Sequence, residues 1–366
     1  MISGDALGVA LPPQPGARYP EAHSQRGRLV DRRRDIERPS PLPQHILSST
    51  QFDRGFLDYL YTLTTTIRRF DKSREGLGYL QSLLPHKRAM LYFTQPSTRT
   101  FLSFQSACHV LGISASEIRD AATSSERKGE SVEDSLRTFS SYVDLIIMRS
   151  PIAGLCERVA QLLDGTPRPV PIVNAGSGPD EHPTQALLDI YTLRRSLRLG
   201  GGIDGKTICM VGDLKRGRTV RSLARLLTNY DDVRIVFASP PAFRIAEDLR
   251  HDLSVSGLKF HETDDFEAAI ADADAIYMTR IQDEYDAVGA EPVDTSRFHL
   301  TAAHLPRLKT DAVIMHPLPR RDELDVAIDD DPRAKYWRQE RNGMWVRVAL
   351  LTMLFGVDDR VQLPEL

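Results

Sequence analysis

The sequence predicts an α/β protein built from two doubly wound parallel-sheet domains joined by helices. Short apolar runs alternate with segments of helical periodicity over residues 46–356, and this alternation is typical of parallel sheets with right-handed crossovers. Polar clusters follow several of the runs directly, where open α/β sheets bind ligands. A glycine-rich stretch at 200–205 divides the regular part into two halves of about 150 residues, the usual size of a domain.

Composition indicates a globular protein with a sizeable core. Of 366 residues, 41% are hydrophobic and 27% charged, which excludes disorder of the whole chain. The net charge of −3 does not favour a nucleic-acid or membrane-surface partner, and no apolar run reaches the roughly 18 residues of a membrane span. Three cysteines, an odd number without metal-ligand spacing, suggest buried thiols in a reducing, cytoplasmic compartment.

The first half begins with an irregular segment, residues 1–45, which holds seven prolines and seven arginines and is expected to be a flexible arm. Its five acidic residues argue against a transit peptide, and it has no apolar core typical of a secretory signal. From residue 46 the chain becomes regular. Helices are expected at 52–63, 101–111 and, as an amphipathic helix, 186–199; buried strands are expected at 88–93, 143–148 and 171–174.

The second half repeats the pattern. Strands are expected at 206–211, 234–238, 275–278 and 312–315, with helices near 219–228, 242–256 and 266–272. A last apolar segment, 344–355, is expected to pack back on the first half. The predicted organisation is therefore an arm at 1–45, domains at 46–199 and 200–343, and a C-terminal helix within 344–366.

One motif is rejected. Residues 200–207 match the phosphate-binding pattern G-x-x-x-x-G-K-[ST], which requires a strand before the loop and a helix after it. Here a predicted helix comes before the glycines and a predicted strand after them. A linker ending in a tight turn explains the segment better.

A better anion site is expected at residues 93–100. Ser97, Thr98, Arg99 and Thr100 lie between a buried strand and an apolar-faced helix. Unpaired backbone N–H groups at a helix start attract anions, and a guanidinium suits phosphate geometry. An ordinary N-cap beside a surface arginine is the alternative interpretation.

Further polar clusters follow other strands. They are Arg149, His182 to Gln185 before a helix, Gly212 to Thr219, Thr279 to Gln282, and His316 to Arg320. A single arginine after a strand is usually a surface ion-pair partner, and a lone histidine before proline is usually a turn residue. Several such clusters at strand ends together predict a strongly anionic ligand set bound between two domains.

These residues resemble the aspartate/ornithine carbamoyltransferase family. The motifs are Ser97-Thr-Arg-Thr100, Met148-Arg-Ser-Pro151, His182-Pro-Thr-Gln185, Gly212-Asp-Leu-Lys215, Gly217-Arg-Thr219 and His316-Pro-Leu-Pro-Arg320, in the family's order and spacing over roughly residues 45–356. The resemblance implies two α/β domains, a trimer with shared sites, and carbamoyl transfer from carbamoyl phosphate to L-aspartate, an early step of pyrimidine synthesis. It implies no metal and no cofactor.

The resemblance also implies residue roles. Ser97, Thr98, Arg99 and Thr100 would hold the phosphate, and Arg149, His182 and Thr100 would polarise the carbonyl. Gln185 and the carbonyls of Pro317 and Leu318 would hold the amide, with Pro319 shaping that loop. Arg218, Arg280 and Gln282 would bind aspartate. Lys128, by itself only a solvated charge, would reach both substrates from the neighbouring subunit.

The sequence departs from the family pattern at three places. Ser150 stands where a histidine is usual, Gln95 where an acid is frequent, and the segment 283–285 is more acidic than usual. Gln95 cannot form an ion pair with a site arginine, so the closure of the two domains is expected to be held differently.

Two alternative functions stay open. One is carbamoyl transfer to ornithine or a related amine, although the His-Cys-Leu-Pro motif of ornithine enzymes is replaced by His316-Pro-Leu-Pro319. The other is a non-catalytic scaffold within a larger pyrimidine-synthesis assembly, in which regulatory or pathway subunits would be the partners. The scaffold should have lost Arg99, His182 or Lys128, but all three are present.

Overall fold

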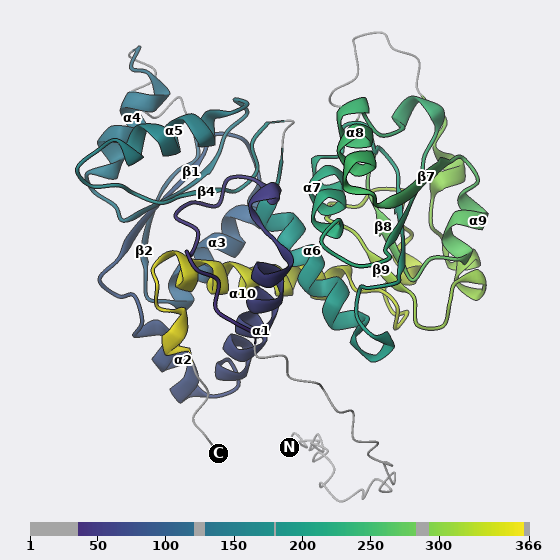
Figure 1. The fold of residues 1–366 in the computed structure, drawn as a ribbon, viewed down its shortest axis with the longest axis horizontal. Helices are drawn as coiled ribbons and strands as arrows, with labels where there is room; N and C mark the ends of the chain where they lie inside the picture. The colour runs from purple at the N-terminus through teal and green to yellow at the C-terminus, as the bar shows by residue number, and fades with distance from the viewer. Residues whose placement is uncertain (1–35, 121–128, 179–180, 283–292, 362–366) are drawn as a thin grey trace, which may run out of the picture. The chain divides into compact units, whose positions relative to one another are not determined.

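The computed structural model describes residues 36–120, 129–178, 181–282 and 293–361. Ile36 to the C-terminus forms one compact unit. Figure 1 shows that this unit contains two sheets, each with helices packed beside it. Both sheets are parallel throughout, as the predicted fold class requires.

The first sheet has the strand order β2-β1-β3-β4. Its strands are β1 (Arg88–Phe93), β2 (Ser114–Ile118), β3 (Leu145–Arg149) and β4 (Ile172–Asn174). Every residue of β3 is buried, which is the burial expected of a central parallel strand covered on both faces. Phe93 at the end of β1 pairs with Arg149 at the end of β3, so the loops that follow these strands start side by side.

Helices surround this sheet. They are α1 (Arg54–Phe70), α2 (Arg74–Gln81), α3 (Thr98–Val110), α4 (Val132–Ser140), α5 (Leu155–Asp164) and α6 (Pro183–Ser196). Side-chain caps define several of their starts. The Asp53 carboxylate accepts from the backbone N–H of Phe56 at 2.8 Å, and the Ser73 hydroxyl accepts from Gly76 at 2.9 Å.

The second sheet has the strand order β7-β6-β5-β8-β9. Its strands are β5 (Thr207–Val211), β6 (Arg234–Ala238), β7 (Lys259–Thr263), β8 (Ala275–Met278) and β9 (Val313–Met315), and its helices are α7 (Arg218–Leu227), α8 (Glu247–Ser256) and α9 (Phe266–Ala271). The 200–205 stretch lies in turns between α6 and β5, so the rejected phosphate motif has the reversed context that the sequence indicated.

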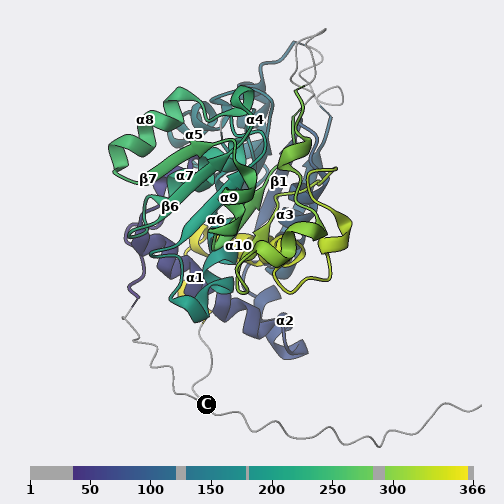
Figure 2. The same cartoon turned by 90° about the vertical axis from the view of Figure 1, so that its right-hand side faces the viewer.

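Two long helices connect the halves. The last helix, α10 (Tyr336–Leu354), contacts α6, α3 and α1, and α6 also contacts α7 beside the second sheet. Figures 1 and 2 both show α6 and α10 close to each other within the described unit. One hydrophobic cluster continues from Phe56 of α1 through Leu188 of α6 to Phe237 of β6, so a common core spans both sheets.

The structure corrects two predicted segments. The segment 186–199 is not an amphipathic helix, because every residue from Pro183 to Leu193 is buried. Contact with α10 on one side and α7 on another leaves this part of α6 no solvent face. The C-terminal helix begins at Tyr336, eight residues before the predicted 344, because a polar run at 338–342 separates its first residues from the apolar stretch.

The compact unit begins before the end of the predicted arm, residues 1–45. Residues 36–45 belong to the compact unit, where Arg38 forms two hydrogen bonds of 2.7 and 2.8 Å with Asp358 near the C-terminal end. His45 Nδ1 also accepts from the backbone N–H of Ile172 at 3.0 Å. The rest of the predicted arm, residues 1–35, lies outside the described residues.

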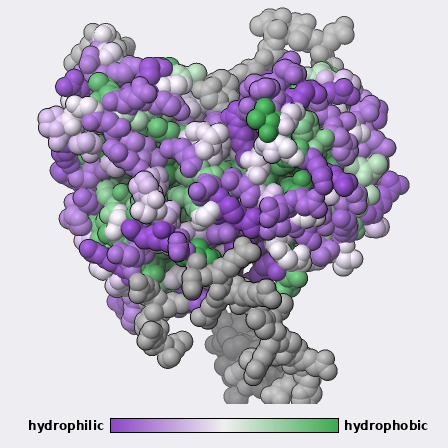
Figure 3. Space-filling model, in the orientation of Figure 1, coloured by the Kyte–Doolittle hydropathy of each residue, from purple (hydrophilic) through white to green (hydrophobic). Residues whose placement is uncertain are grey.

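The three thiols are buried, as predicted. Cys108, Cys156 and Cys209 are core residues that form no disulfide, and burial raises the pKa values of Cys108 and Cys209 to about 12. Among the described residues, no helix is long and apolar enough to span a bilayer. The face drawn in Figure 3 is mainly hydrophilic, with hydrophobic residues in small groups.

Candidate active site

A cavity of about 330 Å³ collects nearly all of the predicted site residues. Its lining comes from the last residue of β3, from the loops after β1, β4, β5, β8 and β9, and from the helices α3, α6, α7 and α10. The lining residues are Pro96, Ser97, Arg99, Thr100, Arg149, His182, Gln185, Gly217, Arg218, Thr219, Thr279, Arg280, Gln282, His316, Pro317, Leu318, Pro319, Glu340 and Arg347.

Sheet topology explains why these residues meet. In the first sheet the strand order reverses between β1 and β3, and in the second between β5 and β8. Chains leaving such neighbouring strands run in opposite directions and leave a crevice at the carboxyl edge. Arg99 and Arg149 follow the first pair of strands, and Arg218 and Arg280 follow the second.

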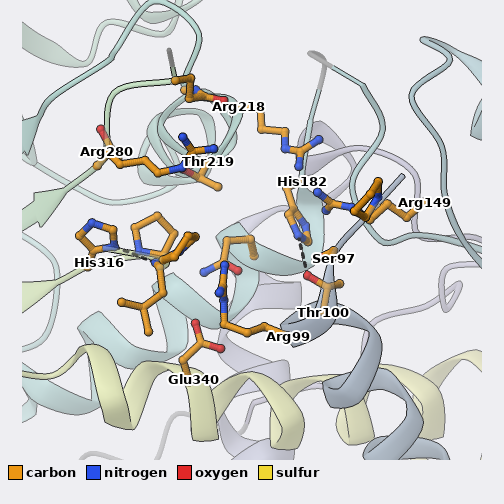
Figure 4. A pocket seen from close by; sticks show the side chains of 18 of the residues that line it. Ser97, Arg99, Thr100, Arg149, His182, Arg218, Thr219, Arg280, His316 and Glu340 are labelled. Carbon is orange, nitrogen blue, oxygen red and sulfur yellow. Dashed lines mark hydrogen bonds between the residues drawn. The ribbon is translucent and has the colours of Figure 1, made fainter. Parts of the chain in front are cut away.

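The loop before α3 leaves its helix start without a side-chain cap. Ser97 is the N-cap residue of α3, but its side chain makes no capping hydrogen bond. The positive end of α3 is therefore left open beside Arg99 and Thr100, both of which line the cavity. Figure 4 shows the side chains of Arg99 and Thr100 extending from this helix start.

Arg149 and His182 lie together on one wall. Arg149 Nη1 donates to the backbone carbonyl of Ala175 at 3.2 Å, and Thr100 Oγ1 lies 3.5 Å from His182 Nε2 (Figure 4). The next residue, Gly176, has φ +111°, and a Cβ there would lie 2.5 Å from Arg149 Nη1 and 3.2 Å from His182 Cδ2. Only glycine lets the backbone approach both side chains this closely.

His182 is held neutral by its surroundings. Burial, followed by the charges of Arg149, Arg218 and Arg347, lowers its pKa well below 6.5. His182 is the N-cap residue of α6 but makes no side-chain capping bond, so the interpretation as a simple turn residue does not explain it. Its Nδ1 is buried and has no partner among the described residues.

The loop at 316–319 is fixed from behind. The backbone N–H of Leu318 donates to His316 Nδ1 at 2.7 Å, and His316 Nε2 lies 2.7 Å from Glu323 Oε1. With Nδ1 accepting, the ring proton belongs on Nε2, where it donates to Glu323. These contacts hold Leu318 at φ +53°, a left-handed conformation unusual for leucine.

The arginines of the second half approach from the opposite side. Arg218 Nη1 donates to the Gly178 carbonyl at 2.7 Å and to Gln95 Oε1 at 3.4 Å, so a site arginine ties the two halves together. The neutral amide of Gln95 thus accepts a long hydrogen bond from a charged guanidinium, where an acid would form an ion pair. The Gln282 backbone N–H donates to the buried Asp213 at 3.2 Å, which fixes the segment carrying Arg280 and Gln282.

The sequence analysis did not identify two of the residues that line the cavity, Glu340 and Arg347, both of which lie in α10. Arg347 Nη1 donates to Ser103 at 2.7 Å, its guanidinium lies 4.8 Å from the Phe104 ring, and burial lowers its pKa to about 10. Burial raises the pKa of Glu340, while Arg347 and Arg99 oppose that rise. A charged residue within the apolar segment 344–355 was the signal that could have identified Arg347.

Some predicted residues are not on the lining. Thr98 is the first residue of α3 but does not line the cavity. Lys128 and the acidic segment 283–285 lie outside the described residues. Ser150 is buried, and its hydroxyl accepts from the backbone N–H of Ile152 at 3.2 Å, so it is part of the loop structure.

Comparison with known proteins places the chain in a family. Residues 44–195 match the family model for the "Aspartate/ornithine carbamoyltransferase, carbamoyl-P binding domain", and residues 204–354 match the "Asp/Orn binding domain". The chain belongs to the aspartate/ornithine carbamoyltransferase family. The two matched segments contain every described residue to which the resemblance assigned a role.

Individual relatives within this family agree. The aspartate carbamoyltransferase catalytic subunit of Thermococcus gammatolerans is 38% identical over 313 residues, covering 85% of this chain and 97% of the relative. A chloroplastic aspartate carbamoyltransferase of Pisum sativum is 39% identical, covering 84% and 77%. The multifunctional protein CAD of Squalus acanthias is 43% identical over 86% of this chain, but the match spans only 13% of that much longer protein.

Solved structures of the family share the fold. Aspartate transcarbamoylase from Trypanosoma cruzi in complex with carbamoyl aspartate and phosphate has a TM-score of 0.73 at 35% identity, covering 84% of this chain and 94% of the other. The same enzyme with N-(phosphonacetyl)-L-aspartic acid has a TM-score of 0.74 at 35% identity over the same shares.

Proposed function

We propose that this chain is an aspartate carbamoyltransferase, which transfers the carbamoyl group of carbamoyl phosphate to the amine of L-aspartate. The products are N-carbamoyl-L-aspartate and phosphate, at an early step of de novo pyrimidine synthesis. The observation that carries the proposal is the cavity itself, which brings five arginines from both halves around one space. Family membership supports the same conclusion.

The charges of the substrates explain the arginines. Carbamoyl phosphate carries about two negative charges, and aspartate carries two carboxylates. Two like charges 4 Å apart repel by about 4 kcal/mol at an effective dielectric constant near 20, so the substrates cannot meet without cations. The five are Arg99, Arg149, Arg218, Arg280 and Arg347.

Ser97, Thr98, Arg99 and Thr100 bind the phosphate in this proposal. The open N-terminus of α3 and the guanidinium of Arg99 supply charge, and the hydroxyls supply donors. Thr98 is the weakest member of the set, because it does not line the cavity. Its backbone N–H, at the helix start, is its available donor.

Arg149, His182 and Thr100 stabilise the reaction's developing oxyanion. The aspartate amine attacks the carbamoyl carbon, and the carbonyl oxygen takes up negative charge as a tetrahedral intermediate forms. Donors that already point at that oxygen are worth several kcal/mol. The intermediate then expels phosphate, which takes the amine proton. His182 serves as a neutral donor, since its pKa is well below 6.5.

The remaining roles divide between the two substrates. Gln185 and the carbonyls of Pro317 and Leu318 hold the carbamoyl NH2, with Pro319 shaping the loop. Arg218, Arg280 and Gln282 bind aspartate from the second half. Figure 4 shows Arg218 and Arg280 on the side of the cavity opposite Arg99, as a two-substrate site requires.

Transfer to ornithine is the second candidate function. It would need a carboxylate in the cavity to bind the cationic amine, and Glu340 is a carboxylate on the lining. Glu340, however, lies near Arg99 at the phosphate side rather than beside Arg218 and Arg280. Its charge therefore acts on the phosphate-binding side.

A ureido-product assay with carbamoyl phosphate and a panel of amines tests the function. We expect product with L-aspartate and none above background with L-ornithine. Activity with ornithine alone would overturn the proposed substrate. No product with any amine would favour the scaffold alternative.

We further infer a homotrimer in which Lys128 of one subunit completes a neighbour's site. The inference rests on the family resemblance, because Lys128 lies outside the described residues. Mixing the inactive variants Lys128→Ala and Arg99→Ala should restore activity, because some sites in a hybrid would receive neither change. Hybrids confirmed by native mass spectrometry that remain inactive would contradict shared sites.

Location and pathway partners stay predictions. A cytoplasmic location agrees with three buried cysteines that form no disulfide. The plant relatives are named as chloroplastic, and one relative is part of a multifunctional protein. Cell fractionation, with a co-purification of pathway enzymes, would test both.

A further inference from the structure

The buried carboxylate of Asp189 is the centre of a hydrogen-bond network directly behind the cavity. Asp189 lies on α6, one turn after Gln185, and is fully buried. Its Oδ1 accepts from Gln185 Nε2 at 3.0 Å and from Gln339 Nε2 at 2.7 Å, and its Oδ2 accepts from the Tyr277 hydroxyl at 2.7 Å. The network joins α6, α10 and β8.

The directions of the two glutamine hydrogen bonds in this network follow from one backbone group. The backbone N–H of His316 can only donate, and it donates to Gln339 Oε1 at 3.0 Å. The Gln339 amide is thereby oriented with its NH2 toward Asp189, so Asp189 Oδ1 must be an acceptor. An acceptor at Oδ1 also requires Gln185 to present its NH2 there.

The consequence reaches the cavity. Gln185 lines the cavity, and one N–H of its Nε2 donates to Asp189. Its Oε1, an acceptor, has no hydrogen-bond partner among the described residues and is left for a ligand. Without Asp189, the Gln185 amide could turn by 180° and offer a donor instead, because its oxygen and nitrogen ends have nearly the same shape.

We propose that Asp189 is a positioning residue that fixes the Gln185 amide so that its oxygen selects a carbamoyl NH2 over a methyl group. The proposal rests on the proposed function and deepens it. The NH2 of a carbamoyl group donates a hydrogen bond to Gln185 Oε1. The methyl of an acetyl group cannot donate, so it leaves this acceptor desolvated and unpaired. Sites built to pair a polar substrate group reject analogues that lack it for this reason.

The same hydrogen-bond network also extends to the loop at 316–319. Gln339 links Asp189 to the backbone N–H of His316, and His316 Nδ1 accepts from the N–H of Leu318. Asp189, which orients Gln185, thus also holds the 316–319 loop. The Pro317 and Leu318 carbonyls of this loop are proposed to accept from the carbamoyl NH2. All acceptors proposed for this NH2 depend on one buried carboxylate.

The test compares carbamoyl phosphate with acetyl phosphate, which carries CH3 in place of NH2. The measured quantities are the KM of carbamoyl phosphate at saturating aspartate and the inhibition constant of acetyl phosphate as a competitor. Neither constant depends on the fraction of folded enzyme, so a partly folded variant still gives an answer. The wild-type assay is run first: absence of ureido product there refutes the proposed function and not this inference.

Asp189→Leu removes the acceptors while keeping the same branched side-chain shape, and Asp189→Asn keeps an oxygen for the two glutamines. For the Leu variant we expect the KM of carbamoyl phosphate to rise about tenfold or more, while the inhibition constant of acetyl phosphate changes by less than about threefold. For the Asn variant we expect both constants to stay within about threefold of wild type, because Asn Oδ1 can still accept from both amides.

Gln185→Met supplies the second comparison. It removes the selecting oxygen itself, so adding Asp189→Leu to it should change the ratio of the two constants less than Asp189→Leu does alone, because only the effect through the 316–319 loop remains. Equal changes in both constants for Asp189→Leu, or an unchanged KM of carbamoyl phosphate, would overturn the proposal. If the Leu variant does not fold, Asp189→Ala gives the same comparison, with the same outcomes deciding.

Discussion

At the scale of single residues, His182 shows how burial and neighbouring charges set a protonation state. Burial, followed by three arginine charges, holds its pKa well below 6.5, although a free histidine is half protonated near that pH. The sequence showed His182 before a proline and could not show which arginines surround it. The arginines come from β3, α7 and α10, which only the fold brings together.

The pKa of His182 has a consequence for stability. Because the unfolded state binds the proton more readily, His182 lowers the free energy of unfolding as the pH falls below about 6.5. We expect His182→Asn to lose less stability than wild type between pH 7.5 and pH 5.5, measured by urea unfolding. Exposed His86→Asn is the control and should follow the wild type. A parallel loss in His182→Asn and wild type would contradict a neutral, buried His182.

Gly176 makes a second prediction at this scale. In Gly176→Ala the new methyl would lie 2.5 Å from Arg149 Nη1, and φ +111° is strained for alanine. We expect kcat to fall at least tenfold in the ureido assay, because Arg149 must move. Gly201→Ala has a similar φ of +91° but nothing within 4 Å, so it should show the backbone cost alone and keep wild-type kcat.

At the scale of elements, the strands predicted correctly from the sequence were the buried ones with continuous apolar runs. Residues 88–93, 234–238 and 275–278 were predicted as strands with the bounds that the structure gives them, because they are apolar runs of strand length. The edge strands β2 and β7 were missed. Their sequences, SASEI and KFHET, are largely polar and partly exposed, so neither carries a continuous apolar run.

The contact between α10 and α6 makes a prediction about packing. A Cβ at Gly343 would lie 2.8 Å from both Leu188 Cδ2 and Arg347 Nη1. We expect Gly343→Ala to reduce the free energy of unfolding by about 1–3 kcal/mol through overpacking. Gly78→Ala is the matched control, since nothing lies within 4 Å of its Cβ in α2. It should stabilise by about 0.5–1 kcal/mol, so the two substitutions should differ in sign.

At the scale of the whole molecule, the two sheets are held together by polar contacts beside the shared core. Arg225 of α7 donates to Glu181 Oε1 at 2.6 Å and to Asp252 of α8 at 2.7 Å. Glu181, the residue before His182, also accepts from the backbone N–H of Ser49 at 2.7 Å. A site residue is thus positioned through contacts from segments far apart in the chain.

Arg225→Met tests this connection. Glu181 keeps its contacts to Ser49, so we expect a moderate loss of about 1–2 kcal/mol in the free energy of unfolding, without a change in fold. The exposed pair of Lys259 and Asp232 provides the control. Lys259→Met should change stability by no more than about 0.5 kcal/mol, as exposed ion pairs contribute little. Equal effects of both substitutions in thermal or urea unfolding would contradict a structural role for Arg225.

The sequence by itself determined the fold class, the central strands and most of the site, because apolar runs and polar strand ends are local patterns. Arg149, His182 and Arg280 could be identified from such patterns. Tertiary structure alone decided that α6 is buried all round, that Arg347 and Glu340 of α10 reach the cavity, and that Asp189 orients Gln185. Each of these features depends on contacts between segments that are far apart in the chain. A sequence pattern within one segment does not show which other segment packs against it.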